Sequence, residues 1–100
     1  MLFVITAIDK PNCIDLRMAT RAAHLQYLAD AGDRIKLGGP LQSEGDDPQP
    51  VGSMIVIEAA SEGAVRLFAQ NDPYTAAGLF ESVTIKPFKA VTGSWLGSTE

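Results

Sequence analysis

The chain has 100 residues, of which 46% are hydrophobic and 20% are charged, a composition typical of one globular domain. Its net charge is −4 and its lysines and arginines are scattered, which argues against nucleic-acid binding because that needs clustered basic side chains. The sequence has one cysteine, no signal-peptide pattern and no apolar run of the roughly 20 residues that span a membrane. We therefore expect a cytoplasmic protein without disulfides or membrane contact.

The first half of the chain predicts a strand, a helix and a second strand. Residues 2–8 are almost all apolar and rich in branched side chains, which indicates a strand buried on both faces. A helix is expected from about Asp15 to Ala31, with Gly32 as its stop. Its apolar residues recur at three- and four-residue spacing: Met18, Ala22, Leu25, Leu28 and Ala29. Residues 34–37 then form a short strand that ends at Gly38-Gly39-Pro40.

The second half predicts a strand, an interrupted helix and a last strand. Residues 42–52 are typical of a polar, flexible loop, and residues 53–58 of a third strand. Ser61 is expected to cap a second helix that runs to about Asn71 and buries three apolar side chains, Val65, Leu67 and Phe68. Asp72-Pro73 interrupts this helix, residues 79–88 form the fourth strand, and Trp95 lies in the tail that follows.

The order β-α-β-β-α-β predicts an α+β fold with one four-stranded antiparallel sheet and both helices on one face. The whole chain, residues 1–100, is expected to form one domain with its core at about 2–90 and a tail at 91–100. The first and third strands are apolar on both faces, so the face without helices would be an exposed apolar patch. Either a second copy, giving a homodimer, or the tail with Trp95 would cover it.

His24 is the strongest candidate for chemistry, because it is the only histidine and histidine changes charge near neutral pH. Arg17, Arg21 and His24 stand at i, i+4 and i+7 and share one stripe of the first helix. His24 would then act as general acid or base while the arginines hold an anionic substrate. The alternative is a solvated helix edge with a histidine at its border.

Asp72 and the Gly38-Gly39-Pro40 segment each have two interpretations. Asp72 either caps a short helix over residues 73–77 or orients the imidazole of His24. The glycines either form a tight turn or let a ligand approach the backbone closely. Tyr74 either offers a hydroxyl near Asp72 or packs in the core. We expect neither a metal nor a cofactor, because paired cysteines and a dinucleotide fingerprint are missing from the sequence.

Several segments together resemble one family, the YciI-like (YCII-related) proteins: Phe3-Val4-Ile5, Arg21-Ala22-Ala23-His24-Leu25, Gly38-Gly39-Pro40, Asn71-Asp72-Pro73-Tyr74, Gly78-Leu79-Phe80 and Val83-Thr84-Ile85-Lys86-Pro87-Phe88. The resemblance covers about residues 2–90. It implies a ferredoxin-like fold of the dimeric α+β barrel type and a candidate catalytic pair at His24 and Asp72. One branch of the family is a dehydrochlorinase acting on a chlorinated hydroxyhydroquinone, and other members are domains of regulatory proteins.

Two functions therefore remain open. The first is a small cofactor-free lyase or isomerase with His24 as general acid or base, Asp72 as its orienting partner, and a small organic substrate. The residues expected to contact this substrate are Arg21, Gly39, Pro40 and Tyr74. The second is a non-catalytic module for small-molecule binding or dimerisation. A direct His24–Asp72 hydrogen bond that opens into a concave pocket would favour the enzyme.

Overall fold

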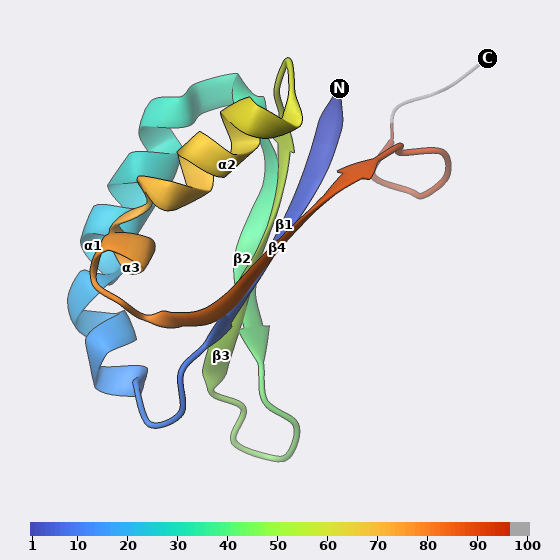
Figure 1. Ribbon diagram of the computed structural model, residues 1–100. Helices are drawn as coiled ribbons and strands as arrows, with labels where there is room; N and C mark the ends of the chain where they lie inside the picture. Colours follow the sequence, from blue (N-terminus) through green and yellow to red (C-terminus); the bar gives the residue numbers. More distant parts are fainter. Residues whose placement is uncertain (97–100) are drawn as a thin grey trace.

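The computed structural model describes residues 1–96, and its elements follow the order expected from the sequence. The strands are β1 (Leu2–Asp9), β2 (Ile35–Gln42), β3 (Pro50–Glu58) and β4 (Phe80–Phe88), and the helices are α1 (Ile14–Ala31), α2 (Glu62–Gln70) and α3 (Pro73–Ala76), with a 3-10 turn, η1 (Gly32–Arg34), after α1. The strands lie in the order β2-β3-β1-β4, and all neighbours are antiparallel. The helices cover one face of the sheet (Figure 1). This is the predicted ferredoxin-like α+β fold.

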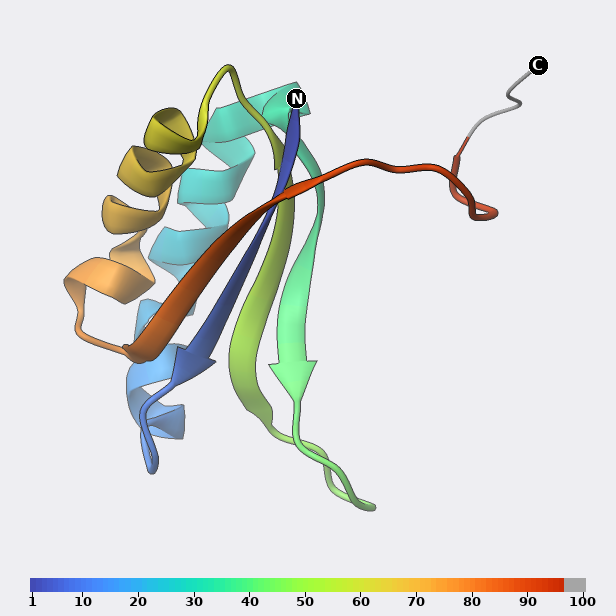
Figure 2. The same cartoon turned by 45° about the vertical axis from the view of Figure 1, so that its right-hand side comes forward.

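The hydrophobic core lies between the two central strands and the helices. Phe3 and Ile5 of β1 and Ile55 and Ile57 of β3 are at most 4% exposed, and Val65 of α2 packs against them. Alternate residues of the same strands point to the opposite face, which no helix covers (Figure 2). Within one chain, β1 is therefore fully buried on one face only.

Strand β2 is longer than predicted, because Gly38, Gly39 and Pro40 lie inside it and not in a turn after it. They pair with Ile55, Met54 and Ser53 of β3. β2 is an edge strand, where a proline can be placed without costing a hydrogen bond of the ladder. Pairing with β3 thus outweighs the low strand propensity of glycine. Since β3 also begins earlier, at Pro50, the loop is shorter than expected and spans residues 43–49.

Helix α1 buries different residues from those that its apolar spacing predicts. Met18 and Leu25 are 56% and 44% exposed, while Arg17 and His24 are only 4% and 6% exposed. The buried face of this helix is thus partly polar, which is the first structural sign of a functional site. No helix in residues 1–96 combines the length and apolar character needed to cross a membrane.

Helix α2 begins as predicted, since the Ser61 hydroxyl accepts a hydrogen bond from the Ala64 amide at 3.2 Å. Val65 and Phe68 are buried, but the prediction that Leu67 is buried is wrong, because it is 59% exposed. Successive helix residues are rotated by about 100°, which places Leu67 away from the face that carries its two neighbours.

The tail leaves the uncovered sheet face open, although its residues 92–96 line one side of a groove on that face. Residues 91–96 lead away from the end of β4 (Figures 1 and 2), and Trp95 is 81% exposed. The remaining residues of the predicted tail, 97–100, lie outside the described residues.

At Gly52, strand β3 lies very close to β1. A Cβ atom at this position would lie 2.4 Å from the carbonyl oxygen of Ala7, a backbone atom with little freedom to move. We expect Gly52→Ala to lower the free energy of unfolding by about 1–3 kcal/mol, as overpacking does elsewhere, measured by urea unfolding. Gly39→Ala is the control, because nothing lies within 4 Å of its Cβ position. Equal stability of the two variants would contradict the close approach.

Candidate active site

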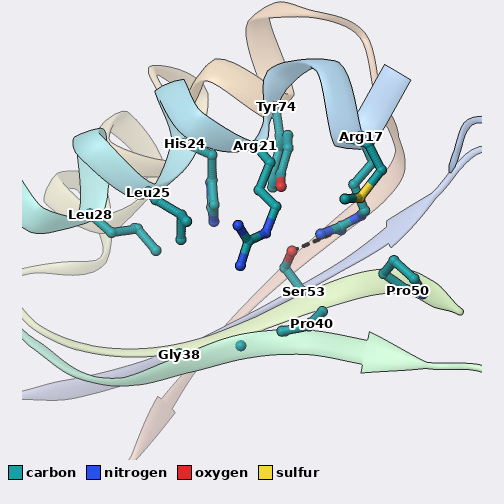
Figure 3. Close-up of a pocket in the computed structure, with 12 residues that line it drawn as sticks. Arg17, Arg21, His24, Leu25, Leu28, Gly38, Pro40, Pro50, Ser53 and Tyr74 are labelled. Atoms are coloured by element: carbon teal, nitrogen blue, oxygen red, sulfur yellow. Dashed lines mark hydrogen bonds between the residues drawn. The ribbon is translucent and has the colours of Figure 1, made fainter. Parts of the chain in front are cut away.

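Apart from Asp72, the site residues expected from the sequence line a cavity between α1 and strands β2 and β3 (Figure 3). The cavity has a volume of about 110 Å³. His24, Arg21 and Tyr74 point into it from the helical side, and Gly39 and Pro40 line it from β2. The longer strand β2 thus brings the Gly-Gly-Pro segment to the site as part of the sheet.

His24 is buried and hydrogen-bonded to Asp72. Its Nδ1 atom lies 2.8 Å from Oδ1 of Asp72, and the two residues are 6% and 4% exposed. A carboxylate oxygen accepts the hydrogen bond, so the proton of a neutral His24 ring resides on Nδ1. The other ring nitrogen, Nε2, is then an unprotonated acceptor on the cavity side of the ring, which Figure 3 shows pointing toward the sheet.

Asp72 makes both of the contacts that the sequence left as alternatives. The same Oδ1 atom that contacts His24 accepts a hydrogen bond from the Tyr74 amide at 2.9 Å, which caps α3. Pro73 occupies the first position of this helix, where its missing N–H costs nothing. The helix cap and the contact with the imidazole thus share one carboxylate oxygen.

The ring of Tyr74 is stacked on His24. Their centroids are 4.0 Å apart with an interplanar angle of 21°, and Tyr74 is 1% exposed. Burial raises the pKa of Tyr74 above its ordinary value of 10.0, an effect opposed by the positive charges of Arg17 and Arg21. The hydroxyl therefore stays protonated at neutral pH and can donate a hydrogen bond.

Arg17 is not free to hold an anion, contrary to the prediction. Its guanidinium donates to both carboxylate oxygens of Asp9, at 2.7 and 2.9 Å, and to the Ser53 hydroxyl at 2.9 Å. Burial lowers the pKa of Arg17, but Asp9 and Tyr74 raise it by more, so the guanidinium remains charged. Neither Asp9 nor Ser53 belongs to a recognisable sequence motif, since Asp9 only follows the apolar run of residues 2–8 and Ser53 only begins the predicted third strand.

Arg21 is the exposed cation of this cavity, one helical turn from Arg17 and from His24. Its guanidinium points into the cavity (Figure 3), and its positive charge acts on the Tyr74 hydroxyl. Leu25, Leu28 and Pro40 add apolar walls. Such a mixture of apolar walls and a few convergent polar groups is typical of small-molecule sites. Within residues 1–96, no three histidine, cysteine or acidic side chains cluster as metal ligands would.

Comparisons with known proteins show which family and fold this chain resembles. The model of a family described as YCII-related domain matches residues 1–89. Protein YciI of Escherichia coli O6:H1 is 41% identical over 98 residues, covering 91% of this chain and 99% of that protein. A similar solved structure is that of TftG from Burkholderia phenoliruptrix, a 5-chloro-2-hydroxyhydroquinone dehydrochlorinase in complex with 2,5-dihydroxybenzoquinone. Its sequence is 37% identical and its TM-score is 0.85, and the match covers 89% of this chain and 94% of that one. An antibiotic biosynthesis monooxygenase shares the fold alone. Its sequence is 16% identical and its TM-score is 0.55, over 92% of this chain and 100% of that one.

Proposed function

This chain belongs to the YCII-related domain family, and from that premise we propose that it is a small cofactor-free enzyme that moves protons on a single-ring, hydroxylated organic molecule. His24 is the general acid or base, Asp72 orients it, and Arg21 binds an ionised substrate oxygen. The observation that carries the proposal is the His24 ring, with Nδ1 held by Asp72 at 2.8 Å and Nε2 on the side of the cavity.

The His24–Asp72 pair has the arrangement that general acid–base catalysis requires. A carboxylate at Nδ1 selects the tautomer that leaves Nε2 free to accept a proton, and it stabilises the imidazolium that forms. Asp72 is itself fixed by the α3 cap, so little reorganisation is needed during the reaction. A positioned imidazole contributes about 100- to 10,000-fold to a proton transfer.

The size and charge of the cavity support a single-ring anion as substrate. Its volume is about 110 Å³, and an engineered apolar cavity of about 150 Å³ in another protein holds benzene. Because this cavity opens to solvent, substituents of the ring can extend beyond it. Arg21 supplies the positive charge for an ionised hydroxyl, and the related structure that contains 2,5-dihydroxybenzoquinone supports this class of ligand.

The experiment uses 2,5-dihydroxybenzoquinone in heavy water. A ring hydrogen is replaced by deuterium when a deuteron adds to the ring carbon and the proton then leaves it, without any change in oxidation state. We expect the protein to bind this ring, measured by calorimetry, and to accelerate the exchange, measured by proton NMR. His24→Gln is expected to lose about 100- to 10,000-fold of the rate. Arg66→Gln, which removes an exposed charge on α2, is the control.

Each outcome of this experiment is informative. Binding together with exchange that depends on His24 supports the enzyme. Binding with exchange no faster than in buffer contradicts it and favours the non-catalytic binding module. A protein that does not bind the ring at all would contradict the proposed substrate class.

We also propose that two copies pack through the uncovered sheet face. A groove of about 810 Å³ lies on this face, lined by apolar side chains that include Leu2, Val4, Met54, Val56, Phe88 and Trp95. Soluble monomers seldom leave such a continuous patch exposed, and a second copy would cover it symmetrically.

Sedimentation equilibrium tests this dimer. We expect the mass of two chains for the native protein and of one chain for Val4→Glu, which places a charge in the centre of the face. Trp95 is the only tryptophan, so its fluorescence reports burial directly and should shift to the blue with increasing protein concentration. A monomer at all concentrations contradicts the proposal, as does a blue shift that is independent of concentration, which would indicate that the tail covers the face.

A further inference from the structure

The Tyr74 ring lies between two side chains of α1. His24 is stacked on it at 4.0 Å, and the guanidinium carbon of Arg17 lies 4.6 Å from the same ring centroid. Arg17 and His24 are seven residues apart, or about 10 Å along the helix. In Figure 3 the Tyr74 ring lies between the His24 ring and the side chain of Arg17. Tyr74 is thus clamped between a cation and an imidazole.

Arg17 is itself held by residues of the sheet. Asp9 at the end of β1 binds two of its nitrogens, and Ser53 of β3 accepts a third hydrogen bond. The Arg17 and Asp9 side chains are 4% and 7% exposed. A buried ion pair contributes little net stability compared with apolar residues of similar volume. The Arg17–Asp9 ion pair is therefore better explained by its contact with Tyr74 than by the stability of the fold.

The hydroxyl of Tyr74 points into the cavity beside Arg21 (Figure 3). In contrast, the hydroxyl of Tyr27 already donates to the carbonyl oxygen of Phe68 at 2.7 Å. A donor fixed next to the reacting proton can stabilise charge that develops on a substrate oxygen.

Building on the proposed function, we propose that Arg17 is a positioning residue for Tyr74. Held by Asp9 and Ser53, Arg17 keeps the Tyr74 ring in place. The Tyr74 hydroxyl then donates a hydrogen bond to the substrate oxygen whose charge changes when His24 transfers the proton. Tyr74 is then a catalytic residue that contacts the substrate, and Arg17 acts only through it. The planar guanidinium is essential to this role, because it binds both carboxylate oxygens of Asp9 while its carbon stays 4.6 Å from the centre of the Tyr74 ring.

The test is a double-mutant cycle on the deuterium exchange of 2,5-dihydroxybenzoquinone. Tyr74→Phe is expected to lower the rate constant at saturating ring about 100- to 1,000-fold, as the loss of one preorganised donor does elsewhere. The variant Asp9→Leu/Arg17→Met, which removes the ion pair without leaving a buried charge, is expected to lose at least 10-fold. In the Tyr74→Phe background, removing the ion pair should change nothing further, because Arg17 acts through the hydroxyl.

A second variant and a spectroscopic readout keep the test independent of folding and of activity. Arg17→Lys keeps the charge but removes the planar group, and it should show the same loss. With ¹³C-labelled tyrosine, the two edges of the clamped Tyr74 ring should give separate resonances in the native protein and averaged ones in Arg17→Lys. Glu62→Gln/Arg66→Gln removes an exposed ion pair on α2 and serves as the control.

The possible failures are distinguishable. Suppose that the native protein accelerates the exchange, and that removing the ion pair lowers the rate equally with and without the Tyr74 hydroxyl. Arg17 then has only a structural role and the inference is wrong. An averaged Tyr74 ring in the native protein would also overturn it. If the native protein does not accelerate exchange, it is the proposed function that fails.

Discussion

Replacing Asp72 by asparagine is expected to slow the deuterium exchange of 2,5-dihydroxybenzoquinone about 100- to 10,000-fold, the range of general acid–base catalysis, because the imidazolium form of His24 loses its counter-charge. The fold should survive, since asparagine is also a good N-cap and its oxygen can accept the hydrogen bond from the Tyr74 amide.

The measurement is the exchange rate at saturating ring, compared with that of Asp30→Asn. Asp30 is an exposed residue near the end of the same helix as His24, hydrogen-bonded to Gln26, so this control makes the same chemical change away from the site. A rate for Asp72→Asn within a factor of three of the native rate would show that Asp72 serves only as a helix cap.

Replacing Asp9 alone by leucine is expected to lower the free energy of unfolding by about 3–5 kcal/mol, because the buried guanidinium of Arg17 then has no counter-charge. The Arg17 and Asp9 side chains are 4% and 7% exposed, so solvent screens them poorly. A loss of this size is a large fraction of the stability of a small domain. Urea unfolding measures it.

The double variant Asp9→Leu/Arg17→Met should recover most of this loss, since replacing both partners of a buried ion pair by apolar side chains is often neutral. Glu62→Gln, which breaks an exposed ion pair on α2, should change stability by less than about 1 kcal/mol. If Asp9→Leu is as stable as the native protein, Arg17 finds water or another partner and the pair is not tightly buried.

The order of strands and helices was predictable because it depends on local patterns. Apolar runs, the Ser61 cap and the Asp72-Pro73 break all act within a few residues, and all three are present in the structure. The extent of β2 was not predictable in the same way. Gly38-Gly39-Pro40 is typical of a turn in isolation, and only the pairing with β3 at the sheet edge makes it a strand.

The site was predictable where one helix carries it and not where distant segments meet. The spacing of Arg17, Arg21 and His24 indicated that they share one stripe of α1, and in the structure all three line one cavity. Spacing on one helix does not reveal that Asp9, on another element, neutralises Arg17. The sequence feature that points to such an acid is an arginine on the helix stripe that also carries His24. An arginine that is buried there requires a buried acidic partner.

The most direct test of the proposed mechanism is the ¹⁵N NMR spectrum of the His24 ring, recorded with and without 2,5-dihydroxybenzoquinone. His24 is the only histidine, so its signals need no further assignment to a residue. We predict that Nδ1 carries the proton in the free protein, held by Asp72, and that the resonance of Nε2 moves when the ring binds. A proton on Nε2 in the free protein, or an Nε2 resonance that does not respond to bound ring, would contradict the assignment of His24 as the proton-transfer group.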